Sequence, residues 1–158
     1  MKTFKILITA LLVSCLFSCD DKPGENDVYN TKAAVPQKFD VAKLHLVVIN
    51  TSINEKDSTM SILYGNPLAY SQLKQGIGII KNGGLLALVT WKQQADVHWF
   101  GANIPGELLS VEYVKADSVG HGIKYRRLLG QALQEDPDTL HSAEREVFIM
   151  SQKPSVMP

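Results

Sequence analysis

Histidine is the side chain that most readily binds metals or transfers protons near neutral pH. The chain contains His45, His98, His121 and His141. No pair of them has the short spacing of an H-x-H or H-E-x-x-H metal motif. Of the four, His98 is the candidate ligand for a metal. The alternative is a packing role, because an extended chain would place His98, Phe100 and Ala102 on one face of a sheet.

Two carboxylates, Glu107 and Glu112, flank a predicted strand that follows Pro105-Gly106. Either side chain could accept a proton if it were buried, whereas carboxylates on strand edges are usually exposed. No nucleophile-elbow sequence marks a catalytic serine, and no glycine-rich loop has the strand-to-helix context of a nucleotide site. The sequence therefore gives no recognisable catalytic constellation.

Aromatic residues are the candidates for lining a ligand pocket. They are Tyr64, Trp91, Trp99 and Phe100, together with Tyr113. Aromatic rings supply large contact areas with few polar demands, so these side chains could surround a flat ligand. They could equally form the core of a small sheet protein.

The N-terminus has the pattern of a lipoprotein signal peptide. A short basic segment, residues 1–5, precedes the apolar residues 6–18, and Leu16-Phe17-Ser18-Cys19 is followed by two acidic residues. The apolar stretch is shorter than the ~20 residues of a membrane-spanning helix, but it suits a signal peptide. We predict removal of residues 1–18 and lipidation of Cys19, with palmitate among the acyl chains. Anchoring in a membrane would follow.

Leu12-Val13-Ser14-Cys15 fits the same pattern, so two cleavage sites compete. Cleavage before Cys15 would leave two apolar residues at the new terminus, whereas Cys19 lies where apolar sequence gives way to acidic sequence. We therefore favour Cys19; an uncleaved anchor or an ordinary secretory peptide is the alternative. The protein would face the periplasm or the cell surface, and the outer membrane is the expected location.

The predicted processing leaves no thiol, since Cys15 is discarded and Cys19 is lipidated. Disulfides, thiolate metal sites and cysteine nucleophiles are then excluded. Without the signal peptide, fourteen basic residues remain against sixteen acidic ones, a net charge of about −2. Because both signs are spread along the chain, the sequence predicts no nucleic-acid binding. We interpret the basic residues Lys124, Arg126 and Arg127 as a solvated face.

The apolar pattern predicts an α+β domain, mainly an antiparallel β-sheet with peripheral helices. Residues 19–38 comprise the lipidated cysteine and a polar, flexible tether, and residues 39–158 form one domain. Strands are expected at 44–49, 59–64, 98–102, 108–114 and 123–129. A hairpin is expected from 77–80 and 85–91, with Lys81-Asn82-Gly83-Gly84 as its turn. Helices are expected at 68–75 and 142–151. Turns are expected at 50–57 and at Pro105-Gly106.

Particular residues are expected to start the two helices and to face the core. Asn66-Pro67 predicts the start of the first helix, and Ser142 is the expected N-cap of the second. The buried side chains are expected to be Leu68, Ala69, Leu73, Val147, Phe148 and Met150.

Four segments together resemble the cytochrome P-460 family, and most closely its lipoprotein branch. They are residues 59–66, 86–94, 98–106 and 110–112, and the closing residues 152–158 are similar to the way that branch ends. The resemblance implies an extracytoplasmic, mainly antiparallel β domain, often dimeric, that holds a haem against one face of its sheet. Haem-containing members attach the group through C-x-x-C-H and a lysine cross-link, and they oxidise hydroxylamine or bind small gases.

The chain departs from that family pattern because it has no C-x-x-C-H motif. The resemblance offers only His98 as an axial ligand and Lys92 as a cross-linking lysine, and an exposed lysine at a strand end is the alternative for Lys92. We therefore expect no cofactor, with haem left open by the resemblance. The leading hypothesis is a membrane-anchored small-ligand-binding or interaction module. The alternative is a haem protein acting on hydroxylamine, nitric oxide or peroxide, and a third hypothesis is a structural lipoprotein with an exposed β-edge.

Overall fold

A computed structural model of the chain describes residues 30–117, 122–138 and 140–155. The chain divides into two units, Met1–Asn30 and Thr31–Pro158. The predicted signal peptide, Cys19 and His121 lie outside the described residues. Within the described part, no helix combines the length and hydropathy needed to cross a bilayer.

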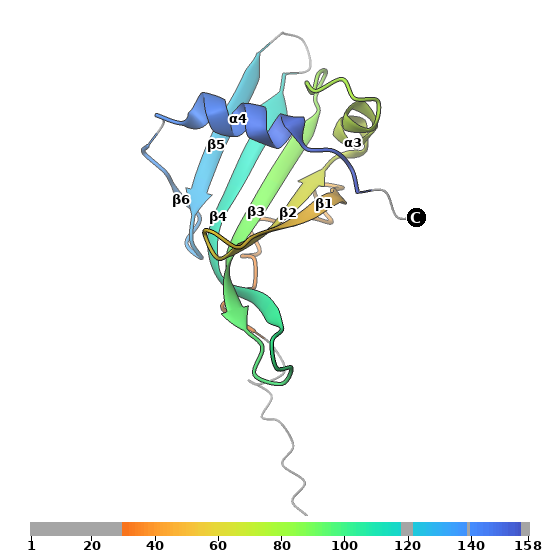
Figure 1. Ribbon diagram of the computed structural model, residues 1–158. Helices are drawn as coiled ribbons and strands as arrows, with labels where there is room; N and C mark the ends of the chain where they lie inside the picture. Colours follow the sequence, from red (N-terminus) through yellow and green to blue (C-terminus); the bar gives the residue numbers. More distant parts are fainter. Residues whose placement is uncertain (1–29, 118–121, 139, 156–158) are drawn as a thin grey trace, which may run out of the picture. The chain divides into compact units, whose positions relative to one another are not determined.

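Six antiparallel strands form one sheet in which each strand pairs with the next along the chain (Figure 1). They are β1 (Val47–Asn54), β2 (Thr59–Gly65), β3 (Leu85–Ala95), β4 (Asn103–Ala116), β5 (Ile123–Leu129) and β6 (Gln134–Glu135). In the described part of the chain, two helices accompany them, α3 (Pro67–Lys74) and α4 (Ser142–Ser151). The predicted α+β class, dominated by an antiparallel sheet, is confirmed.

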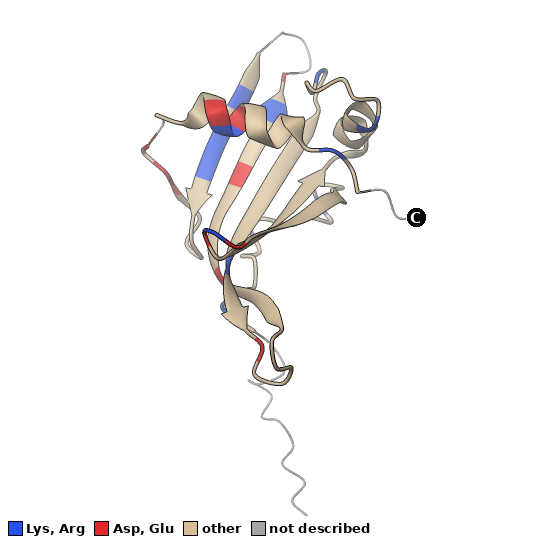
Figure 2. Cartoon of the chain, in the orientation of Figure 1, with Lys and Arg blue, Asp and Glu red and all other residues tan. Residues whose placement is uncertain are grey.

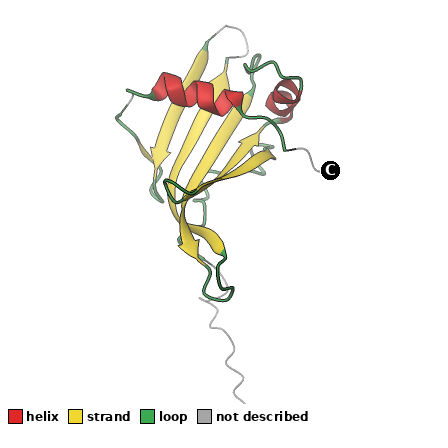
Figure 3. Ribbon diagram, viewed as in Figure 1, coloured by secondary structure: helices red, strands yellow, loops and turns green. Residues whose placement is uncertain are grey.

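Both faces of the sheet are covered. Helices α3 and α4 lie on one face (Figure 3), where they bury apolar side chains that include Leu63, Leu88 and Ile149. On the other face, Phe39 and Leu46 pack over Val89. The central strands β3 and β4 are therefore buried on both sides, as the short apolar runs in their sequences require.

The segment before Phe39 belongs to the second face, although the sequence assigns it to the tether. The indole Nε1 of Trp91 donates to the carbonyl of Ala33 at 2.8 Å. The Leu108 amide donates to the carbonyl of Lys32 at 3.2 Å. Thr31 and the residues after it therefore pack as part of the domain.

The first strand begins and ends later than predicted. Residues 41–45 form turns, His45 has a φ of +50°, and β1 continues through Asn54. Ile49 is the extra residue of a bulge opposite β2 and covers Gly65, where a Cβ would come within 2.5 Å of the Ile49 Cδ1. The predicted turn at 50–57 is correct for residues 55–57 but wrong for 50–54, because these residues pair with β2 as far as Asn54↔Thr59.

The predicted hairpin around Lys81-Asn82-Gly83-Gly84 is also wrong, although its turn is real. Asn82 and Gly83 have positive φ, and the Gly84 amide donates to the Lys81 carbonyl at 3.0 Å. Residues 77–80 do not form a strand, because β3 already has β2 and β4 as neighbours. The turn instead links the end of α3 to β3.

The strand predicted at 98–102 is a loop, and Pro105-Gly106 lies inside β4. Strand β5 pairs only with Ser110–Ala116 of β4, so the missing N–H of Pro105 removes no bond to β5. Gly106 occupies an irregular part of the β3–β4 pairing, where a Cβ would lie 3.0 Å from the Lys92 carbonyl oxygen. Close strand approach, not a turn, explains this glycine.

The two helices have the predicted positions, but some of their details differ. Ala69, Leu73 and Met150 are buried as expected. Three other side chains expected in the core are exposed, namely Leu68, Val147 and Phe148. The N-cap of α4 is His141, not Ser142. Ile149 takes the buried position, because α4 crosses the sheet with its Ile149–Met150 side facing inward.

Asn66 joins β2, α3 and β3 through one side chain. Its Oδ1 accepts from the amides of Ala69 at 2.9 Å and Leu85 at 3.2 Å, and its Nδ2 donates to the Gly83 carbonyl at 3.0 Å. It is the N-cap of α3, and Pro67 follows at the first helical position.

Asn66→Ala is expected to lower the free energy of unfolding by about 2 kcal/mol, because it removes a cap and two further bonds. Asn66→Asp keeps both acceptor contacts and loses only the donor, so its loss should be roughly half as large. Urea denaturation of both variants measures the difference. Equal losses would show that the acceptor contacts contribute little.

Candidate functional site

A polar groove of about 310 Å³ lies on the α4 face of the sheet. Most of its lining is neutral and polar: Asn50, Ser52 and Asn54 from β1, Thr59 and Ser61 from β2, Thr90 from β3, Ser110 from β4, and Gln152 after α4. These residues alternate along their strands with residues of the opposite face. Helix α4 contacts β3, β4 and β5. The polar side chains of β1 and β2 line the rest of the groove.

Hydroxyl and amide groups of the groove are partly paired with one another. The hydroxyls of Ser61 and Thr90 lie 3.0 Å apart across β2 and β3. The Nδ2 of Asn50 donates to the Gln152 Oε1 at 3.2 Å and to the Lys153 carbonyl at 3.2 Å. Each hydroxyl can both donate and accept, so these groups keep capacity for a ligand.

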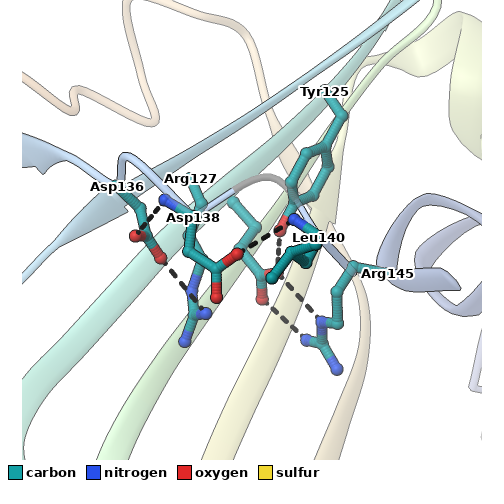
Figure 4. Close-up of polar contacts among 7 residues, drawn as sticks. Tyr125, Arg127, Asp136, Asp138, Leu140 and Arg145 are labelled. Atoms are coloured by element: carbon teal, nitrogen blue, oxygen red, sulfur yellow. Dashed lines mark hydrogen bonds and ion pairs between the residues drawn. The ribbon is translucent and has the colours of Figure 1, made fainter. Parts of the chain in front are cut away.

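One wall of the groove contains an ionic network centred on the buried Glu112 of β4. Its partners Tyr125 and Arg145 are labelled in Figure 4. Glu112 is 1 % exposed. Its Oε1 accepts from the Arg145 Nε at 3.0 Å and from the Tyr125 hydroxyl, and its Oε2 accepts from the Arg145 Nη2 at 2.7 Å. This bidentate geometry binds α4 to β4, and Tyr125 adds β5.

The network raises the pKa of both partners of Glu112, Tyr125 and Arg145. Burial, the hydrogen bond to Glu112 and the charge of Glu112 all raise the pKa of Tyr125. The hydrogen bond to Glu112 also raises the pKa of Arg145, against the effect of burial. Tyr125 therefore stays a neutral donor and Arg145 a cation across the physiological range.

A second ion pair and an aromatic ring complete the charged end of the groove. The Arg127 Nη1 lies 3.3 Å from the Asp136 Oδ2. The guanidinium of Arg145 lies over the Phe148 ring, with 4.8 Å between its Cζ and the ring centroid. Figure 2 shows charged positions on β4, β5 and α4, whereas β2 carries none. The lining thus combines neutral polar groups, cations already paired to carboxylates, and the Asp57 carboxylate, which accepts from the Asn54 Nδ2 at 2.8 Å.

This arrangement suits binding better than bond cleavage. Glu112 has no free role as a proton acceptor, because three donors already occupy its oxygens. The groove size is at the low end for small-molecule sites. The lining offers a ligand many hydrogen-bonding groups, an aromatic edge and cations that already have carboxylate partners.

Lys92 and His98, the residues predicted to hold haem, are surface residues of β3 and of the loop that follows it. Both side chains are exposed, and neither lines the groove. His98 lies in the loop between β3 and β4, where its amide donates to the Asp96 Oδ1 at 2.8 Å. Lys92 lies opposite Thr59 near the end of the β2–β3 pairing. An axial ligand would have to face an apolar pocket, which these positions do not provide.

The predicted pocket aromatics separate into two groups. Tyr64 and Trp91 pack in the core of the second face, and Phe39 makes edge contacts with Tyr64 and Tyr113 at centroid distances of 6.1 and 5.7 Å. Burial raises the pKa of Tyr64 and, against the opposing charge of Arg126, that of Tyr113. Trp99 and Phe100 lie instead on the exposed β3–β4 loop, away from that core. The four candidates therefore do not line one pocket.

The remaining chemical candidates lie on the surface. His45 and Glu107 are exposed, and the Nδ1 of exposed His141 lies 3.3 Å from Glu144 Oε2. Among residues 30–117, 122–138 and 140–155, no group of three or more His, Cys, Asp or Glu side chains is arranged to hold a metal ion.

The basic residues of β5, interpreted from the sequence as a solvated face, are all paired with carboxylates. Lys124 pairs with Asp117, Arg126 with Glu135 and Arg127 with Asp136. Arg126 and Arg127 thus connect β5 to the β6 end of the chain. These pairs leave little positive charge without a partner on β5.

Arg145, Tyr125 and the hydroxyls of β1 and β2 were not identified as site residues from the sequence. The available signal was the alternation of Ser110, Glu112 and Val114 with Leu109, Val111 and Tyr113 in β4, but Glu112 was interpreted as a carboxylate of the usual exposed kind. Ser110, Glu112 and Val114 are all buried. Arg145, on the helix predicted at 142–151, is the cation that pairs with Glu112. Its presence on that helix was the feature that could have corrected this interpretation.

No protein-family model matches the chain, and a search of curated proteins found no match to it.

Glu112→Gln is expected to lower the free energy of unfolding by about 2 kcal/mol, less than the 3–5 kcal/mol of a fully buried pair, because Arg145 can reach solvent. Arg145 is 37 % exposed in its side chain. Glu107→Gln removes an exposed carboxylate of the same strand and should stay within about 0.5 kcal/mol of the parent. Chemical denaturation compares the two. Matching values would contradict a structural role for the network.

Proposed function

We propose that this chain is a membrane-anchored extracytoplasmic lipoprotein whose cytochrome P-460-like domain carries no covalent haem and binds a small, neutral, hydroxyl-rich molecule. A monosaccharide or disaccharide has this chemistry. The observation that carries the ligand proposal is the polar groove on the α4 face. The proposal of a lipid anchor is based on the sequence Leu16-Phe17-Ser18-Cys19.

The family part of the proposal is supported by sequence resemblance and by the class of fold. The resembling segments fall mainly on β2, β3 and β4, which form the centre of an antiparallel sheet flanked by helices. The absent C-x-x-C-H motif and the exposed positions of Lys92 and His98 support a role without haem. Because proteins that share a fold can differ in function, the proposed ligand is inferred from the groove.

The ligand class follows from the groove lining. Hydroxyls of Ser61, Thr90 and Ser110 and amides of Asn50 and Gln152 can alternate donors and acceptors along a ligand. Sugar hydroxyls have the same dual capacity. A strongly anionic ligand fits less well, because the cations of the groove already have carboxylate partners. A large flat apolar ligand would leave the hydroxyls unsatisfied.

Titration of the protein with glucose, N-acetylglucosamine and their disaccharides is expected to move amide NMR signals of residues around the groove. The Ser61→Ala/Thr90→Val double variant removes two paired hydroxyls at nearly constant volume, so it should fold normally. Loss of two ligand hydrogen bonds should weaken binding about tenfold. Calorimetry measures that change.

Thr51→Val is the matched control, because Thr51 pairs with Ile62 on the opposite face of the same sheet. Its affinity should equal that of the parent. The ligand proposal would be overturned if no sugar in the panel binds, or if the double variant and the control bind equally well.

The haem-free part is tested by the optical spectrum of the natively exported protein. We expect no Soret band, because the chain has no C-x-x-C-H motif and neither Lys92 nor His98 faces a pocket described above. A Soret band that survives denaturation would demonstrate covalent haem and favour the alternative activity on hydroxylamine, nitric oxide or peroxide. Haem added to the apo-protein should give the same spectrum in the parent and in His98→Ala.

A further inference from the structure

The loop between β3 and β4, residues 96–102, exposes three large apolar side chains. Val97 is 84 % exposed, Trp99 is 72 % exposed and Phe100 is 109 % exposed. Scattered apolar residues on a surface need no explanation, but a concentration of three in one short loop marks an interaction site. We call this loop the apolar tip.

Hydrogen bonds give the apolar tip a defined conformation. The Asp96 amide donates to the Ala102 carbonyl at 2.9 Å, and the Ala102 amide donates to the Trp99 carbonyl at 3.0 Å. The His98 amide donates to the Asp96 carboxylate. Gly101 has a φ of +81°, a conformation that glycine adopts at little cost. The backbone therefore holds the aromatic side chains outward.

The apolar tip is at the end of a two-stranded ribbon that extends beyond the sheet (Figure 1). Strand β2 pairs with β3 only as far as Lys92, and β5 pairs with β4 only from Ser110 onward. The pairs from Gln93↔Pro105 to Ala95↔Asn103 have no third strand beside them. This geometry separates the tip from both cores of the domain.

The N-terminal segment of the domain joins it at the root of the same ribbon. The Lys32 carbonyl accepts from the Leu108 amide, and the Ala33 carbonyl accepts from the Trp91 indole. Trp91 and Leu108 are themselves paired across β3 and β4. Residues 19–30 would span at most about 40 Å when fully extended. A lipid anchor at Cys19 would therefore keep the root of the ribbon within about 40 Å of the membrane surface.

We propose that the apolar tip inserts into the interfacial region of the membrane that holds the lipid anchor. This proposal rests on the anchor in the proposed function. Tryptophan favours the membrane interface, where an apolar ring can be buried beside polar headgroups. The three side chains project from one narrow loop, whereas a standard protein interface is a broad surface that buries ~800 Å² on each partner. A loop with a tryptophan at its tip can insert between lipid headgroups without a broad contact surface.

The charges near the apolar tip indicate that insertion does not depend on anionic lipids. Among the described residues, Asp96 and Glu107 are acidic, Lys92 is basic and Lys32 lies at the root of the ribbon, so charges of both signs are present there. Apolar burial is then the driving force. Anchor and tip together would restrict the orientation of the domain, which a flexible tether alone leaves free.

The two tryptophans of the chain allow a direct test in the full-length lipidated protein, reconstituted in phosphatidylcholine vesicles. Trp91 is 5 % exposed inside the domain, whereas Trp99 is at the tip. Bromine on the lipid chains quenches nearby tryptophans, so brominated lipids should remove most of the Trp99 emission. The Trp99→Phe variant retains only Trp91 and should be almost unaffected. Val97→Ser/Phe100→Ser should reduce the quenching of Trp99.

Flotation of the vesicles separates failure of the tip from failure of the anchor. If the protein floats but the parent and Trp99→Phe are quenched equally, the tip proposal is overturned and the anchor stands. If the protein does not float and Cys19 carries no acyl chains by mass spectrometry, both are overturned. Trp99 accessible to aqueous iodide on the vesicle surface would also contradict insertion. Thermal unfolding confirms that each tip variant is folded.

Discussion

The burial of Glu112 is the interaction on which the α4 face of the molecule depends. A carboxylate at 1 % exposure is stable only with compensating donors, and here these come from Arg145 on α4 and Tyr125 on β5. Three elements are thereby held in one arrangement. Because the pair fixes α4 across β3, β4 and β5, the polar side chains of β1 and β2 keep access to solvent, and a groove results.

Strands β3 and β4 are covered by different kinds of residue on the two faces of the sheet. On the α4 face, a polar network closes one end and leaves a groove. On the other face, Phe39 fills the space between Tyr64 and Tyr113, and the segment from Thr31 covers Trp91. The aromatic residues that best suit a flat ligand are therefore used as core. The residues that remain available for a ligand are small and polar.

The sequence predicted the fold class well where local chemistry and packing agree. Asn66-Pro67 placed α3, and the apolar runs placed β2 and β5. It failed where long-range pairing decides. Residues 50–54 are mostly polar yet pair with β2, and residues 77–80 are apolar yet have no free strand edge to pair with. Glu112 was misinterpreted for the same reason, since only its contact with Arg145, 33 positions away, reveals its burial. The turn predicted at Asn82-Gly83 is present, but the sequence did not specify which segments that turn joins.

The root of the ribbon connects the proposed membrane contact to the groove. The Gln93 amide at the start of the ribbon donates to the carbonyl of Ser58 at 2.8 Å, in the turn between β1 and β2. Asp57 and Thr59, on either side of Ser58, line the groove. A domain whose apolar tip lies in the bilayer would therefore place this end of the groove toward the membrane surface. Ligands exposed at that surface, such as the sugars of glycolipid headgroups, would then meet the groove at its nearer end.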